Sequence, residues 1–332
     1  MYTRYDRDIA ARAQSWLHED APRYCDRPWV LFVSFVAPHF PLTAPSEYFY
    51  EYYESTDLPW PKLYAEAERP RHPFLRDYAG SFVYDRHFDT EDKVRRALAG
   101  YYGLATFLDE QVGKVLTALE RSGLAPDTRV LYTSDHGDNL GSRGLWGKST
   151  LYEEAAAVPL IVAGDDVPAG RTVDTHVSHV DFWPFVFQAT GEPDAAHDGR
   201  PHPGVSLFEL ASGARPERTV ISEYHGMGST TAAFMLRLDH YKYVHYVAYP
   251  DQLFDLDEDP EELVDRIDDP ALATVAREAR SRLEAMLNPG QVDAAAKARQ
   301  RALLAANGGR EAVIARGDLG FSVPPGVAPM FD

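Results

Sequence analysis

Thr133-Ser134-Asp135-His136-Gly137-Asp138 is the stretch that decides the fold, because it directly follows the short apolar run Val130-Leu131-Tyr132. A short apolar run between turn-forming residues indicates a buried strand. In open α/β sheets, ligands bind beyond the carboxyl ends of the strands. The Asp–His pair brings a hard oxygen and a borderline nitrogen ligand, so this place suits a divalent cation.

Two further polar features accompany this pair. Lys148, in Gly144-Leu145-Trp146-Gly147-Lys148-Ser149, brings a compact positive charge that suits an anionic substrate. His39, in Pro38-His39-Phe40-Pro41, follows the apolar residues 29–36, and an imidazole there suits a general acid or an anion ligand. Taken alone, each feature is equally typical of a surface turn, in which Asp135 caps the turn and His39 is merely exposed.

Strands and helices alternate as far as residue 190. Apolar runs typical of buried strands cover residues 29–36, 129–134 and 158–162. Helical spacing marks residues 4–18, 92–122 and 179–190. This alternation predicts an α/β fold with a doubly wound, mostly parallel sheet.

The pattern changes after the turn-rich residues 191–217. Short strands separated by tight connections predict a small antiparallel sheet, at residues 220–224, 232–238, 242–247 and 252–256. Residues 260–287 have helical spacing and are expected to cover that sheet. We therefore divide the chain into an α/β catalytic domain (1–217), a sheet-plus-helix subdomain (218–290) and an Ala-rich helix with a Gly/Pro-rich tail (291–332).

Composition limits the partners. The net charge of −18 disfavours binding to nucleic acid or to an anionic membrane, so an anionic substrate needs a local positive site. No apolar segment is long enough to span a bilayer, and the first residues do not resemble a signal peptide, which predicts a cytoplasmic location. Cys25 is the only cysteine, which excludes an internal disulfide. A homo-oligomer is left open.

Together these motifs resemble the sulfatase family of the alkaline phosphatase superfamily, in particular choline-sulfatase-like and arylsulfatase K-like members. The resemblance rests on Pro38-His39-Phe40-Pro41, Ser134-Asp135-His136-Gly137, the Lys148 stretch and, later, Ser222-Glu223-Tyr224-His225-Gly226. It extends from about residue 4 to about residue 290. It implies an alkaline phosphatase-like fold and hydrolysis of a small anionic sulfate ester with a divalent metal.

The resemblance also implies roles for individual residues. Asp135 and His136 would be metal ligands, with calcium favoured over manganese or magnesium. Lys148 and His39 would hold the sulfate group and assist departure of the leaving group. His225 would lie at the substrate pocket. Two alternatives stay open: a phosphodiester or phosphonate monoester hydrolase of the same superfamily, and a non-catalytic binding protein derived from a sulfatase.

The sequence lacks several motifs of the family pattern, among them a Lys/His pair on a further loop. Family members carry a first strand with paired metal aspartates and then Cys-x-Pro-Ser-Arg, whose cysteine becomes the formylglycine nucleophile. Neither motif is present here, and Cys25, in Cys25-Asp26-Arg27-Pro28, does not fit the second. We therefore expect an N-terminally truncated chain that lacks the first strand–helix units, with doubtful activity and exposed core surface.

Overall fold

The computed structural model describes residues 2–24, 26–164, 166–192, 202–212 and 218–317. Its helices are α1 (Tyr2–Ser15), α2 (Ser46–Tyr53), α3 (Pro73–Ser81), α4 (Glu91–Arg121), α5 (Glu153–Ala156), α6 (Phe182–Ala189), α7 (Leu207–Ala211), α8 (Ala273–Met286), α9 (Pro289–Ala306) and α10 (Gly309–Arg316). Its strands are β1 (Val130–Thr133), β2 (Leu160–Ala163), β3 (Val220–Tyr224), β4 (Ala233–Leu238), β5 (Tyr241–Tyr246) and β6 (Gln252–Asp255). Cys25 and residues 318–332 of the tail lie outside the described residues.

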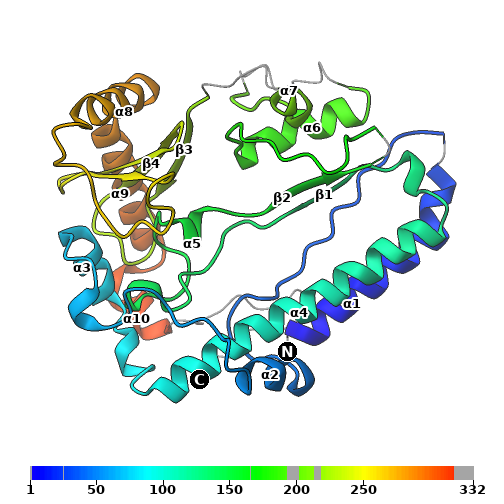
Figure 1. The fold of residues 1–332 in the computed structure, drawn as a ribbon, viewed down its shortest axis with the longest axis horizontal. Coiled ribbons are helices and arrows are strands. Elements are labelled where there is room, and N and C mark those ends of the chain that lie inside the picture. The colour runs from blue at the N-terminus through cyan, green and yellow to red at the C-terminus, as the bar shows by residue number, and fades with distance from the viewer. Residues whose placement is uncertain (1, 25, 165, 193–201, 213–217, 318–332) are drawn as a thin grey trace.

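The first part of the chain forms layers around β1 and β2. On one face, Val130 belongs to an apolar cluster with Leu17 and Leu119, in the layer that holds α1 and the long helix α4. On the other face, Leu131 and Val162 pack against the cluster formed by α6 and α7. Helices thus cover both faces of the strands, as Figure 1 shows, and this confirms the predicted α/β organisation.

The strand pairing differs from the predicted parallel sheet. β1 and β2 pair antiparallel, with Tyr132 opposite Ile161. Their connection contains only two short helical turns, Ser142–Gly144 and Glu153–Ala156, and not the longer crossover helix that usually joins parallel neighbours. Among the described residues, both sheets are antiparallel.

The predicted buried strand at residues 29–36 is wrong. The segment runs in the same direction as β1 (Figure 1), yet it has no partner in any described sheet. Its side chains are also not buried, since Val30 is 61% and Phe32 87% exposed. An apolar run predicts the extended conformation but not the neighbouring strand that would cover it.

The long helix α4 positions the segment that carries His39. Thr90 caps its first turn by accepting a hydrogen bond from the Lys93 backbone N–H at 3.3 Å. Gly100 lets the chain after His39 approach closely, because a Cβ there would lie 2.3 Å from the Leu42 carbonyl oxygen. Residues 92–122 are thus confirmed as a helix with a packing face.

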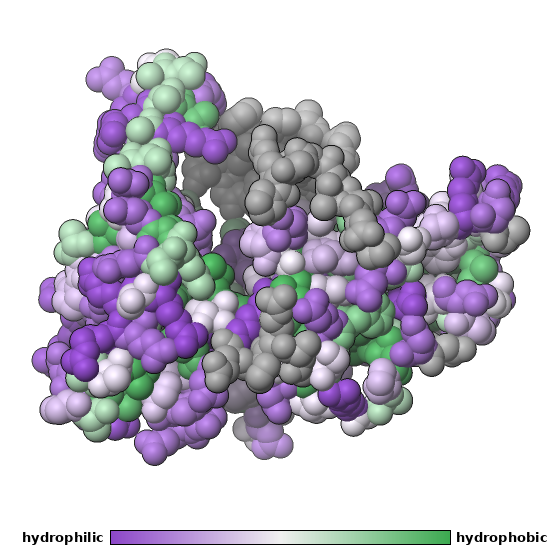
Figure 2. All heavy atoms as spheres, turned by 90° about the horizontal axis from the view of Figure 1, so that it is seen from above, coloured by the Kyte–Doolittle hydropathy of each residue, from purple (hydrophilic) through white to green (hydrophobic). Residues whose placement is uncertain are grey.

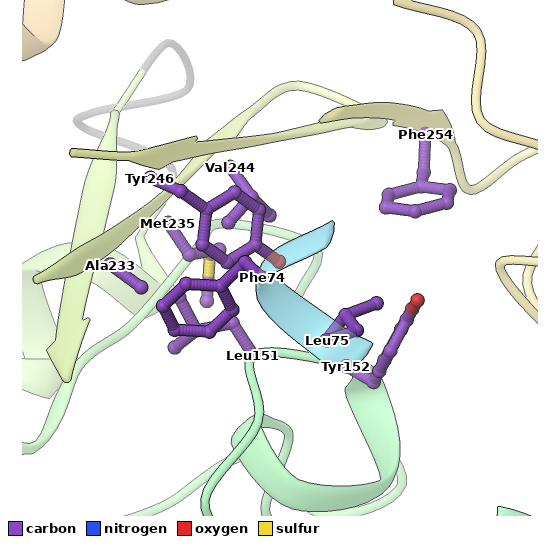
Figure 3. Packing of buried hydrophobic residues seen from close by; sticks show 9 residues of the cluster. All are labelled: Phe74, Leu75, Leu151, Tyr152, Ala233, Met235, Val244, Tyr246 and Phe254. Carbon is purple, nitrogen blue, oxygen red and sulfur yellow. The ribbon is translucent and has the colours of Figure 1, made fainter. Parts of the chain in front are cut away.

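The predicted small antiparallel sheet is confirmed, in the order β3-β4-β5-β6. One face packs on α8 through Ala279 and Leu283. On the other face, Phe74 and Leu75 of α3 meet Leu151, Tyr152 and the strands (Figure 3). The covering helix is shorter than expected: residues 260–272 form turns, and α8 begins at Ala273.

The surface agrees with the charge balance of the sequence. The face shown in Figure 2 is largely hydrophilic, with hydrophobic residues in scattered patches. Among the described helices, each is too short or too polar to cross a bilayer. The domain boundaries at 217 and 290 stay a prediction.

Candidate functional site

The turn after β1 presents Asp135 and His136. A carbonyl only accepts hydrogen bonds, so the 2.8 Å contact with the Gly137 carbonyl makes the Nδ1 of His136 the donor. In the neutral ring this leaves Nε2 as an acceptor, 3.5 Å from the Asp135 carboxylate. Gly137 is required at this position, because a Cβ there would lie 2.0 Å from the Glu154 carbonyl oxygen.

Two polar side chains shape the lysine loop, defined here as residues 138–150. The Asp138 carboxylate accepts hydrogen bonds from the backbone N–H groups of Leu140 (2.8 Å) and Gly147 (2.9 Å). Asn139 donates to the Gly147 carbonyl from its side chain and from its backbone, at 2.7 Å each. Lys148 thus follows a residue whose backbone is held at both polar groups.

Asp138 and Asn139 were not among the residues predicted for the site. The signal was in the sequence, because Asp and Asn next to glycine-rich turns commonly hydrogen-bond nearby backbone groups. Thr150 extends the bracing by donating to the Asn139 side-chain oxygen at 2.8 Å. The loop is therefore held by its own polar residues before any ligand binds.

His39 is placed by a buried carboxylate on α1. Both oxygens of Asp6 accept backbone hydrogen bonds, from Val36 and Ala37, at 2.9 Å each. Asp6 is fully buried, so these bonds compensate much of the cost of burying its carboxylate. They fix the chain two residues before His39, a long-range contact that no local pattern predicts.

His39 and Lys148 meet at this place. The Nζ of Lys148 lies 2.6 Å from the Nε2 of His39. The Nδ1 of His39 donates to the Phe40 carbonyl at 2.7 Å, so in the neutral ring Nε2 accepts from the Lys148 ammonium. The His136 ring lies 6.2 Å from the His39 ring, centroid to centroid. Three separate loops therefore converge here.

Burial shifts the ionisation of this cluster. It lowers the pKa of His39 below its usual value, and nearby Lys148 and His136 lower it further, against the Phe40 carbonyl and Asp138. Burial also lowers the pKa of Lys148, opposed by the charges of Asp135 and Asp138. At neutral pH, His39 is thus neutral and accepts a hydrogen bond from a positively charged Lys148.

A group of hydroxyls that sequence reasoning missed lies behind the lysine loop. The Tyr78 hydroxyl is hydrogen-bonded to Ser149 and Tyr84, and burial raises the pKa of this tyrosine. A Cβ at Gly147 would lie 3.8 Å from the Tyr84 hydroxyl, so Tyr84 reaches the same loop. Tyr78 lies in α3, and Tyr84 begins the short 3-10 turn Tyr84–Arg86.

His225 follows β3 and contacts residues other than His39 and Lys148. Its ring is 3.1 Å from the Glu223 carboxylate and packs edge-on against Phe234, with the centroids 5.5 Å apart. Within the described residues, no hydrogen bond or ring contact joins it to His39 or Lys148. Tyr224, at the end of β3, lies close enough to Tyr78 to raise the pKa of the Tyr78 hydroxyl.

The described residues do not form a complete metal site. They contain no group of three or more His, Cys, Asp or Glu side chains arranged to hold one ion. Calcium takes six to eight oxygen ligands, far more than Asp135 and His136 supply. The Asp135 side chain is 85% exposed, and its Oδ1 accepts a hydrogen bond from the His136 backbone N–H at 3.0 Å. These residues alone do not fit a calcium centre.

The chain matches two family models. A model described as Sulfatase matches residues 2–192. A model described as N-sulphoglucosamine sulphohydrolase, C-terminal, matches residues 141–288. The two matches together cover the β1 turn, the lysine loop and the small antiparallel sheet.

Curated relatives are similar over most of this chain. Choline-sulfatase from Rhizobium meliloti (strain 1021) is 34% identical over 270 residues, covering 80% of this chain and 52% of the relative. Human arylsulfatase K is 31% identical over 278 residues, covering 76% of this chain and 50% of the relative. The chain thus spans about half the length of these relatives.

Solved structures share the fold. The phosphonate monoester hydrolase of Agrobacterium radiobacter superposes with a TM-score of 0.68 at 26% identity, over 83% of this chain and 59% of that one. This likeness confirms the expected alkaline phosphatase-like fold.

Proposed function

This chain belongs to the sulfatase family, and from that premise we propose that it serves the hydrolysis of an organic sulfate monoester. The observation that carries the proposal is the contact between Lys148 Nζ and His39 Nε2 at 2.6 Å. It pairs a half-buried positive charge with an imidazole near the carboxyl end of β1, where a small anionic substrate can contact both.

The proposed roles follow from the hydrogen bonding. The Lys148 ammonium has three N–H donors and donates one to His39, so two remain for the sulfate oxygens. When the sulfur–oxygen ester bond breaks, the leaving oxygen takes a proton, and Lys148 is placed to give it while His39 holds the ammonium in position. Water supplies the oxygen that joins sulfur and loses two protons. One restores the Lys148 ammonium and the other goes to solvent, so the products are the alcohol, sulfate and a proton. His225 remains a proposed substrate contact.

For the metal we propose only two ligands, and for the nucleophile we propose no residue. We propose Asp135 and His136 as two ligands of a divalent metal, calcium ahead of manganese or magnesium, and a bound cation would add positive charge near the sulfate oxygens. The residues present do not complete that site, so no step is derived through the metal. The sequence contains no Cys-x-Pro-Ser-Arg, so no step is derived through a formylglycine either.

Two other functions have specific support. The similar fold of a phosphonate monoester hydrolase favours a phosphodiester or phosphonate monoester as the alternative substrate. The incomplete set of metal ligands favours a sulfatase-derived protein that binds sulfate esters without cleaving them. A cytoplasmic location stays a prediction from the sequence.

One experiment separates the three. Calorimetry with phenyl sulfate measures binding, and release of phenol from phenyl sulfate and from an aryl phosphodiester measures turnover, in the presence and absence of Ca²⁺. Binding with sulfate release supports the sulfatase proposal, whereas faster phosphodiester cleavage supports the first alternative. Binding without any turnover supports the second.

Matched variants assign the binding to the proposed site. Lys148→Ala is expected to weaken phenyl sulfate binding about tenfold or more, since hydrogen bonds to charged groups contribute about 1.5–3 kcal/mol. Lys93→Ala, on the exposed face of α4, is the control, because Lys93 pairs only with exposed Asp89. Equal affinity of the wild type and Lys148→Ala would refute the proposed role of Lys148.

A further inference from the structure

Glu262, in the turns after β6, contacts the chain on both sides of Lys148. Its backbone carbonyl accepts a hydrogen bond from the side chain of Arg143, five residues before Lys148, at 3.1 Å. Its carboxylate accepts a hydrogen bond from the backbone N–H of Glu153, five residues after Lys148, at 2.7 Å. One distant residue therefore holds both ends of the segment that carries Lys148.

The Glu262 carboxylate is itself held by a buried lysine. Lys242 of β5 is fully buried, and its ammonium lies 2.8 Å from Glu262 and 2.9 Å from Glu153. Arg237 of β4 lies 3.3 Å from the same Glu153 carboxylate. Burial would raise the pKa of Glu153, but these two cations lower it below its usual value, so Glu153 is ionised at neutral pH. The small sheet thus presents fixed positive charges to the chain that follows the lysine loop.

These contacts are a poor way to gain stability alone. Removing two charges from water is costly, and apolar residues of similar volume often stabilise a core equally well or better. Glu262 also has a φ of +52°, a left-handed backbone conformation that is unfavourable for a residue with a Cβ. Strain of this kind persists only where the surrounding contacts impose it, and it is common at functional sites. Two costs at one position indicate that Glu262 contributes geometry rather than stability.

We propose that Glu262 is a positioning residue for Lys148 and sets the place of its ammonium beside His39. Glu262 acts through the backbone, because it holds Arg143 and Glu153, and the chain between them brings Lys148 Nζ to 2.6 Å from His39 Nε2. The inference rests on the proposed role of Lys148 in binding sulfate esters. It concerns the shape of the loop, however, which can be measured without a ligand.

The ¹⁵N NMR signal of His39 Nε2 reports the contact with Lys148 directly. We measure it at pH 8, where the ring is neutral, and Lys148→Ala gives the signal position without the ammonium donor. Glu262→Gly removes the carboxylate while suiting the positive φ, and should move the signal most of the way to the Lys148→Ala position. Glu262→Gln keeps an oxygen for the Glu153 N–H and should leave the signal near its wild-type position.

Asp293→Ala is the matched control. Like Glu262, Asp293 accepts a backbone hydrogen bond, from Ala232 at 2.8 Å, and pairs with a lysine, Lys297, at 2.9 Å. These partners belong to the residue before β4 and to α9, so the loss of Asp293 should lower stability without moving the His39 signal. An equal movement in Asp293→Ala and Glu262→Gly overturns the proposal.

Calorimetry with phenyl sulfate separates the positioning role from the proposed function. Glu262→Gly should bind about threefold to tenfold more weakly than the wild type, with affinity recovered in Glu262→Gln. An unchanged His39 signal in folded Glu262→Gly overturns the positioning role and leaves the proposed function intact. If the signal moves but the wild type does not bind phenyl sulfate, the positioning role holds and the proposed function fails. If Glu262→Gly does not fold, the double variant Lys242→Met/Glu262→Gly, which also removes the buried ammonium, takes its place with the same expected result.

Discussion

The lysine loop and residues 29–36 differ in whether their backbone N–H and carbonyl groups have hydrogen-bond partners. In the loop, backbone groups are bonded by Asp138, Asn139 and their neighbours, so its shape is set within the loop. In the segment, residues 30–35 have no such bonds among the described residues, although the sequence there is far more apolar. Polar residues next to turns thus carry their own partners, while an apolar strand depends on a neighbour.

Arg143 extends the loop's contacts into the small sheet. Its side chain is buried, stacks on the Tyr152 ring with Cζ 3.7 Å from the centroid, and pairs with Glu154 at 2.9 Å. It also donates to the carbonyls of Glu261 and Glu262, at 2.7 and 3.1 Å. The loop is therefore attached to residues more than one hundred positions later in the chain.

The largest effect is expected from Arg143→Ala. Removing the guanidinium leaves the Glu261 and Glu262 carbonyls without this donor and leaves Glu154 with Lys62, at 2.7 Å, as its remaining cation. The free energy of unfolding should therefore fall by about 2–4 kcal/mol. Denaturant unfolding measures this change. Arg23→Ala, which removes an exposed pair with Asp20, should change it by about 0–1 kcal/mol. If the two variants lose equal stability, the loop is not held as described.

Asp6→Ala tests the hydrogen bonds by which Asp6 holds Val36 and Ala37, between residues 29–35 and His39. The free energy of unfolding should fall by about 1.5–3 kcal/mol, because the N–H groups of Val36 and Ala37 lose a charged acceptor. Asp6→Asn keeps one carbonyl acceptor and should lose less. Asp8→Ala, on the exposed face of α1, is the control. A phenyl sulfate affinity that is unchanged in Asp6→Ala would show that the anchor does not position His39.

The pH dependence of sulfate binding reports on His39. Because burial lowers the pKa of His39 below 6.5, the ring is neutral at pH 7 and gains its charge only at lower pH. Calorimetry with inorganic sulfate should show affinity rising by up to about tenfold as the pH falls below 6.5, since protonation adds a charge beside the anion. His39→Gln should flatten this profile.

Stability should change in the opposite direction over the same pH range. The unfolded chain binds the His39 proton more readily, so the contribution of His39 is full above pH 6.5 and is lost as the pH falls towards the lowered pKa. Denaturant unfolding of the wild type and His39→Gln measures the difference. A wild-type stability that rises on acidification, relative to His39→Gln, would contradict the pKa shift.

Phe32→Lys tests whether the exposed side chains of residues 29–36 contribute to stability. The free energy of unfolding should change by no more than about 0.5 kcal/mol, because the Phe32 side chain is 87% exposed. Thermal unfolding at low concentration checks this. A loss of about 2 kcal/mol or more would mean that Phe32 is buried in the monomer.

Calcium is expected to have the smallest effect. With only two candidate ligands beside the lysine loop, we expect a dissociation constant of about 1 mM or weaker, so 1 mM Ca²⁺ should stabilise the chain by no more than about 0.4 kcal/mol. Thermal unfolding with and without Ca²⁺ measures the shift. A stoichiometric site with micromolar affinity would show that other residues complete it.

How far the sequence predicted each region depended on the range of the interactions. The four strands of the small sheet were predicted within two residues at each end, because alternation and turn residues are local signals. The Asp–His turn and Lys148 were predicted beside the end of β1 for the same reason. The bracing by Asp6 and Arg143 was missed, because nothing near either residue indicates its distant partner.

The sequence by itself determined where strands and turns form, and which polar side chains follow them, because propensity and periodicity act over a few residues. Only the tertiary structure decided that Lys148 meets His39 across 109 positions, and that residues 29–36 have no partner strand within the described part of the chain. These outcomes depend on which elements pack side by side, and packing is set by surfaces far apart in the chain.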